Sequence, residues 1–165
     1  MDITPLRDAS RAFLDAAATV ADADVPVPDP PAGEWDADRI LAHVTLVNAA
    51  TLAAVSTVAA GAHTTFDNRV ALDAWTIDRA IGLAGGNAGL RERVRHQTDA
   101  LCALAGPVLS EAELDTPVPA RLLSHDTLLL DGAVPLRDLI TGLAEVELPG
   151  HTRQLLALLP EGAAA

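Results

Sequence analysis

Apolar residues recur at intervals of three and four along most of the chain, which is the spacing that places side chains on one face of an α-helix. This pattern predicts a first helix that starts with Thr4 as N-cap and Pro5 in the first helical position. It predicts a second helix from Asp36, a good capping residue, to about residue 60. Residues 22–33 are rich in Asp and Pro, so we expect a surface loop between the two helices.

Two further helices are predicted in the middle of the chain. The first covers residues 67–83, with Asp67 as its cap, and the Gly85-Gly86 pair ends it. Asn87 is expected to cap the second, which stops near Gly106-Pro107. Both segments carry a regular apolar face, so both are predicted to pack against a common core.

Residues 107–135 lack this periodicity and are expected to form a long irregular crossover. Pro117 and Pro119 exclude a helix in the early part. Two short extended pieces are predicted near its middle, over residues 121–124 and 127–130.

The last helix, residues 136 to about 159, contains two ionisable residues on its apolar face. Glu147 and His151 lie four residues apart in a stripe that also contains Leu136, Ile140, Leu143, Leu155 and Leu158. His43 lies in a similar stripe of the second helix, among Ile40, Val47, Ala50 and Ala54. Buried ionisable groups are unfavourable unless they are paired or bind a metal.

A divalent metal held by His43, Glu147 and His151 would account for these three residues. Three protein ligands leave a position for water or substrate, which is typical of a catalytic site. Nitrogen and carboxylate ligands suit zinc, nickel, iron or manganese. Gln154 is placed to orient one of the ligands. Pro149 cannot continue the backbone ladder, so the helix is expected to kink, bulge or restart there.

The pattern as a whole predicts an all-α fold in a single domain over residues 1–165. Four core helices, an extra helix and one long crossover before the last helix match the layout of a four-helix bundle.

The charge and cysteine content narrow the range of functions. A formal net charge of −12 argues against nucleic-acid and anionic-membrane partners, and a single cysteine, Cys102, suits a reducing compartment. Residues 40–62 carry no formal charge, but His43, Asn48 and several Thr favour a buried helix over a membrane span. The N-terminus has no basic segment followed by an apolar one, so no signal peptide is predicted. We therefore expect a soluble, cytoplasmic protein.

The remaining chemically interesting side chains are interpreted as structural. His63 is expected to be solvated in a turn, and His96 to be a surface histidine. His125 stands between a serine and an aspartate, but neighbours in a loop rarely form a catalytic triad. Trp35 and Trp75 are expected to pack in the core, although either could line a pocket, and Cys102 is expected to be a small core residue.

Two motifs carry a resemblance to a known family. The segment Gly33-Glu-Trp35-Asp-Ala-Asp-Arg-Ile-Leu-Ala-His43 resembles the Trp and Leu-Ala-His helix opening of the DinB-like superfamily. The segment His151-Thr-Arg-Gln154-Leu155 is similar to the His-x-x-Gln-hydrophobic signature in its last helix. The resemblance implies a DinB-like four-helix bundle with one metal, usually held by three histidines, which map onto His43, Glu147 and His151.

Glu147 stands where many members have histidine. A His, Glu, His set is similar to the mycothiol-dependent maleylpyruvate isomerase branch, in which zinc serves a thiol cosubstrate. The superfamily also includes S-transferases that use mycothiol or bacillithiol. The resemblance therefore implies a zinc-dependent mycothiol S-transferase or thiol-dependent isomerase that acts on a small electrophile, as a monomer or homodimer.

Two alternatives remain open at this stage. A DinB-like bundle that has lost its chemistry would serve as a non-catalytic binding protein. A metal-dependent hydrolase would use the same three residues to activate water instead of a thiol.

Overall fold

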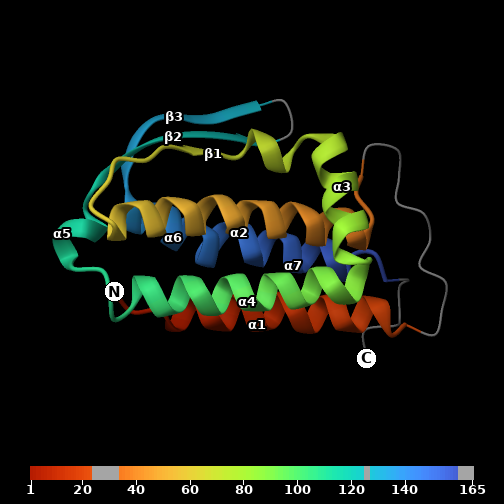
Figure 1. Ribbon diagram of the computed structural model, residues 1–165. Coiled ribbons are helices and arrows are strands. Elements are labelled where there is room, and N and C mark those ends of the chain that lie inside the picture. The colour runs from red at the N-terminus through yellow and green to blue at the C-terminus, as the bar shows by residue number, and fades with distance from the viewer. Residues whose placement is uncertain (24–33, 125–126, 160–165) are drawn as a thin grey trace.

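Four long helical segments lie alongside one another (Figure 1). The computed structural model describes residues 1–23, 34–124 and 127–159, and this part of the chain is predominantly helical, as predicted. The buried apolar side chains of all four segments form one core. The segments are α1 (Thr4–Ala21), α2 (Ala37–Ala59), α4 (Asn87–Ala105) and the last helix, which consists of α6 (Leu136–Gly142), the π-helical turn η2 (Leu143–Glu147) and α7 (Leu148–Leu156).

The start of α1 differs by one residue from the prediction. Thr4 is the first helical residue rather than the cap, and Pro5 follows it in the first turn. The Asp2 carboxylate caps the helix instead, because it accepts the backbone N–H of Thr4 at 2.9 Å.

Helix α2 begins as predicted, with Asp36 as its cap: the carboxylate accepts the backbone N–H of Arg39 at 2.8 Å. This helix is long and apolar enough to cross a membrane by length and composition alone. However, 61% of its most apolar window is buried inside the protein, which is typical of a core helix.

The helix predicted over residues 67–83 begins later, because Asp67 does not cap it. The Asp67 carboxylate accepts the backbone N–H of Arg69 at 3.0 Å and pairs with the Arg69 guanidinium. Asp73 is the actual cap and accepts the backbone N–H of Thr76 at 2.8 Å. The segment therefore divides into the short strand β1 (Phe66–Asp67), the 3₁₀ turn η1 (Arg69–Ala71) and helix α3 (Ala74–Ala84).

The break between α3 and α4 falls at the predicted glycine pair. Gly85 and Gly86 adopt φ values of 77° and 87°, a left-handed region that favours glycine. Gly86, and not Asn87, occupies the cap position of α4. The Asn87 amide instead donates to the Asp38 carboxylate at 3.0 Å, so its role is to tie α4 to α2.

The crossover is not irregular, and the fold is not purely α-helical. A short helix, α5 (Glu111–Leu114), begins with a capping box between Ser110 and Glu113. It is followed by the antiparallel hairpin of β2 (Pro117–Ser124) and β3 (Thr127–Pro135), and β1 pairs with β2 in parallel.

The two extended pieces predicted over residues 121–124 and 127–130 are confirmed as parts of β2 and β3, but both strands are longer than predicted, and β1 was not predicted. Pro117 and Pro119 lie in β2 where β1 does not reach, since β1 pairs only with Ala120 and Arg121. The sheet lies over α2 and α6, on the side away from α1 and α4 (Figure 1).

The predicted disturbance in the last helix is a π-helical turn placed before Pro149. The N–H of Leu148 donates to the carbonyl of Leu143, five residues earlier. This turn restarts the helix, so Pro149 lies in the first turn of α7, where a missing N–H is tolerated. The turn from Glu147 to His151 is therefore regular.

Candidate metal centre

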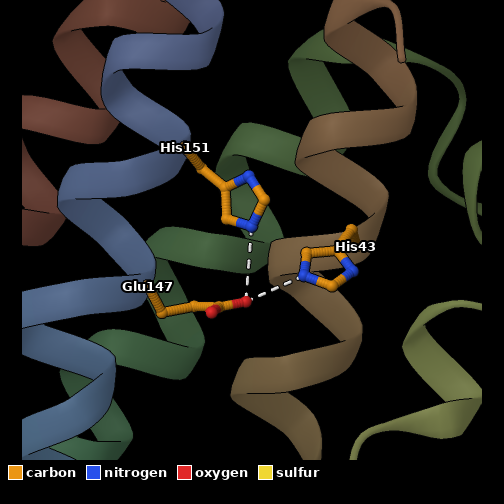
Figure 2. A group of neighbouring side chains, drawn as sticks. All are labelled: His43, Glu147 and His151. Carbon is orange, nitrogen blue, oxygen red and sulfur yellow. Dashed lines mark hydrogen bonds and ion pairs between the residues drawn. The ribbon is translucent and has the colours of Figure 1, made fainter. Parts of the chain in front are cut away.

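The three residues singled out in the sequence come together between α2 and the last helix (Figure 2). Nε2 of His43 lies 2.8 Å from Oε1 of Glu147, and Nε2 of His151 lies 3.3 Å from the same oxygen. One donor atom from each residue falls within 4.8 Å of the other two. The spacing on the two apolar stripes thus predicted the convergence of these side chains.

His43 is held in one orientation by the backbone. It is 4% exposed, and its Nδ1 lies 2.8 Å from the carbonyl oxygen of Ala71 in η1. A carbonyl can only accept, so Nδ1 carries the proton. In the neutral ring, Nε2 then presents its lone pair toward Glu147.

His151 is oriented in the same way by a side chain. Its Nδ1 lies 2.9 Å from Oε1 of Gln154, an acceptor, so Nδ1 again donates and Nε2 faces Glu147. Gln154 therefore positions the imidazole, which is the role predicted for it.

Glu147 is ionised in this environment. Burial opposes ionisation, but hydrogen bonds from His151 and His43 and the charge of these imidazoles outweigh burial and hold the pKa of Glu147 well below its usual range. With both imidazoles neutral instead, and each Nδ1 donating as described, the two Nε2 atoms and the carboxylate would present three electron pairs to one point. Such a set needs either protons on both Nε2 atoms or a cation among the three groups.

A divalent cation fits this donor set better than two added protons. The ring centres of His43 and His151 are only 4.7 Å apart, so two imidazolium rings would repel each other beside a largely buried carboxylate. Bond lengths of about 2.0–2.2 Å from zinc to nitrogen or carboxylate oxygen allow one ion to reach all three donors. The orienting partners of both imidazoles, a carbonyl and an amide oxygen, are those typical of metal-binding histidines.

A cavity of about 430 Å³ opens onto the three side chains. The ring of Trp35 lies 5.0 Å from the ring of His43 and lines this cavity, so Trp35 contributes to a pocket as well as to the core. The remaining walls are mostly apolar and come from α2, the last helix and the sheet, including Val47, Phe66, Leu122, Leu139 and Leu143.

The other candidate residues lie elsewhere. His63 is exposed, as predicted, and His96 is an exposed partner of Glu92 at 3.2 Å. Cys102 is a buried core residue, and burial raises the pKa of its thiol. Trp75 does not pack in the core: it is 70% exposed and lies beneath the guanidinium of Arg79. His125 lies outside the described residues.

Two features of the site escaped the sequence analysis. The carbonyl of Ala71 orients His43, and no side-chain pattern reports a backbone carbonyl. Asn68 fastens the end of β2 through two hydrogen bonds to the backbone of Leu123, at 2.8 and 2.9 Å, and lines the cavity. Alternating buried residues in β2, Val118 and Ala120, were the available signal for the sheet wall.

No protein-family model, curated protein or solved structure matches the chain. The assignment of function therefore rests on the residues of the site.

Proposed function

We propose that this protein is a divalent-metal-dependent S-transferase that uses a low-molecular-weight thiol. The observation that carries the proposal is the convergence of three potential ligand atoms, from His43, Glu147 and His151, beside a largely apolar cavity, with both imidazoles oriented through Nδ1. Zinc is the metal we favour, because two imidazoles and a carboxylate are ligands typical of catalytic zinc.

The residues of this chain have distinct tasks in that reaction. His43 and His151 are held by Ala71 and Gln154 so that only their Nε2 atoms face the site. Glu147 supplies the negative charge that offsets part of a divalent charge, and the apolar walls exclude water. A bound metal supplies one effect, lowering the pKa of a thiol so that the thiolate is available at neutral pH. The sulfur must come from a cosubstrate, because Cys102 is buried in the core and does not line the cavity.

Mycothiol is the cosubstrate we propose. This choice rests on the DinB-like resemblance and on the absence of lysine, which suggests a genome rich in GC and hence an organism of the kind that uses mycothiol. The four long helices, with metal donors on the second and the last, support a DinB-like four-helix bundle as the fold. The proposal retains a cytoplasmic protein, monomeric or dimeric, whose partners are small molecules.

The test combines metal content with thiol-dependent turnover. The purified protein, loaded with zinc, is incubated with 1-chloro-2,4-dinitrobenzene and either mycothiol or glutathione. The expected result is chloride release with formation of the mycothiol thioether, faster than without protein and faster than with glutathione. His43→Ala should abolish the rate, whereas His96→Ala, a matched change at a surface histidine, should not. A rate with mycothiol equal to the uncatalysed rate would reject the transferase.

One observation favours a second candidate, a non-catalytic binding protein. Glu147 already accepts hydrogen bonds from both imidazoles if these carry protons, so the cluster can satisfy itself without a metal. In that case zinc would not bind, and the cavity would still take an apolar ligand. A metal-dependent hydrolase, by contrast, would bind zinc and release product from an ester such as 4-nitrophenyl acetate without any thiol.

A further inference from the structure

Apart from the two histidines of the candidate metal centre, the described residues that line the cavity include acidic side chains but no Arg or Lys. Besides Glu147, the cavity is lined by Glu34 and Asp138, both at exposed positions. All eleven basic residues of the chain are arginines that lie within the described residues, and none of them lines the cavity.

Four arginines stand next to lining residues; three of them are engaged elsewhere, and the fourth, Arg153 beside Gln154, is exposed and does not line the cavity. Arg137 precedes Asp138 but pairs with Glu111 and Asp115 at 2.9 and 2.7 Å. Arg121, which precedes Leu122, pairs with Asp131 at 2.7 Å across the hairpin. Arg69, which follows Asn68, pairs with Asp67. A carboxylate or phosphate on a ligand would therefore meet no guanidinium, the group best suited to bind it, among the residues that line the cavity.

The rim of the cavity is apolar and faces solvent. Leu129 of β3 is 66% exposed and Val146 of η2 is 69% exposed, although both line the cavity. Exposed apolar side chains at the edge of a cavity gain most from a ligand that removes them from water. The hairpin and the π-helical turn thus each contribute an exposed apolar side chain to the cavity.

We infer that this cavity selects an apolar, uncharged electrophile and rejects one that carries a carboxylate or phosphate. The inference rests on the proposed function and deepens it, because it names the class of the second substrate. It favours S-transfer to a neutral molecule over isomerisation of an anionic one. An anionic group would meet the Glu147 carboxylate among walls of low polarity, where repulsion between like charges is screened weakly. The exposed carboxylates of Glu34 and Asp138 add a smaller repulsion, because water screens their charges.

The test compares two ligands of equal size that do not react with thiols, 4-propylbenzamide and 4-propylbenzoate. Isothermal titration calorimetry is performed on the protein as purified and again after chelation, when no metal ion can attract the benzoate. The benzamide should bind more tightly in both forms, by at least about tenfold after chelation. Equal or tighter binding of the benzoate after chelation, or binding of neither ligand, would overturn the inference.

Two surface variants locate the effect without disturbing the core. Asp138→Asn removes one of the acidic groups and should reduce the difference in affinity between the benzamide and the benzoate. Asp15→Asn on α1 is the matched control. Leu129→Arg places a cation at the exposed rim and should strengthen benzoate binding several-fold. Unchanged benzoate binding in both variants would contradict the role assigned to the charge of the cavity.

The measurement after chelation distinguishes failure of this inference from failure of the proposed function. If the protein binds no zinc but still prefers the benzamide, the proposed transferase function is rejected and the inferred preference for uncharged ligands stands. If the protein binds zinc but prefers the benzoate, the metal site stands and the inferred preference for uncharged ligands is rejected.

Discussion

Two Glu-x-x-x-His pairs in this protein have nearly the same geometry and quite different surroundings. Glu92 and His96 of α4 lie 3.2 Å apart, and Glu147 and His151 lie 3.3 Å apart. The side chains of the first pair are 53% and 63% exposed, whereas those of the second are 31% and 17% exposed. The distance between the two residues therefore does not distinguish a surface ion pair from a candidate metal site.

The difference lies in what surrounds each pair. Glu92 also pairs with Arg95, which lowers the pKa of Glu92, and water solvates the pair. Glu147 meets a third group, His43, from another helix, and the ring of His151 is fixed by Gln154. A half-buried pair that meets a buried third donor, with both rings oriented, is suited to bind a metal, and an exposed pair without a third donor is not.

The largest expected difference concerns metal affinity. His43→Ala removes a ligand that lies far from Glu147 in sequence, and we expect zinc affinity to fall by more than about 100-fold, beyond the loss typical of an outer partner. His96→Ala should leave the affinity unchanged. Isothermal titration with zinc measures the affinity of both variants. An equal loss of zinc affinity in His43→Ala and His96→Ala would show that the two Glu-x-x-x-His pairs do not differ in metal binding.

Metal removal should also lower thermal stability. At a free zinc concentration of 100 times Kd, binding stabilises the folded state by about 2.7 kcal/mol, or about 5–10 °C in Tm for a chain of this size. Chelation should therefore lower the Tm of the parent and of His96→Ala, but not that of His151→Ala. A parent Tm that chelation leaves unchanged would favour the non-catalytic binding protein.

A smaller effect is expected at the residue that positions His151. Gln154→Ala leaves all three donors in place but frees the ring, so zinc affinity should fall by about 10–100-fold. Gln97→Ala on α4 offers a matched glutamine away from the site. An affinity in Gln154→Ala equal to that of the parent would show that this hydrogen bond does not orient the ligand.

The smallest expected effect concerns acid stability of the metal-free protein. Because the pKa of Glu147 is lowered on folding, its carboxylate stabilises the fold at neutral pH, and this contribution is lost as pH falls below the ordinary value of 4.5. Glu147→Gln should flatten the decline of Tm with acidification in that range. Denaturation curves recorded between pH 3 and 7, about the range in which carboxyl groups titrate, test this, and the same slope in both proteins would contradict it.

The sequence predicted the helices and the three candidate metal ligands because both follow from the spacing of apolar residues along single helices. A residue on the apolar stripe of a helix faces the core, so Glu147 and His151 were expected to contact polar groups there. His43 was the ionisable residue on the apolar stripe of another helix. The π-helical turn also follows from local chemistry, since Pro149 forces a disturbance, although its position before the proline was not specified.

Parts of β2 and β3 were predicted as extended, but their full length and their pairing into a sheet with β1 were not. Pairing of β1 with β2 joins residues about fifty positions apart, and the hairpin is partly exposed, so its alternation of buried side chains is weak. The cap positions of α1 and α4 differ from the expected ones by one residue, whereas the cap of α3, Asp73, lies a turn and a half beyond Asp67, because Asp67 is engaged with Arg69 instead. The part of the cavity wall that the sheet forms was therefore identified only from the structure.

The most direct test of the metal centre is diffraction from crystals grown with zinc, recorded at the zinc absorption edge. The proposal predicts one anomalous peak about 2.0–2.2 Å from Nε2 of His43, Nε2 of His151 and a carboxylate oxygen of Glu147. It also predicts no peak at Glu92 and His96. Ordered imidazoles hydrogen-bonded directly to Glu147, with no peak among them in crystals that contain zinc elsewhere, would contradict it.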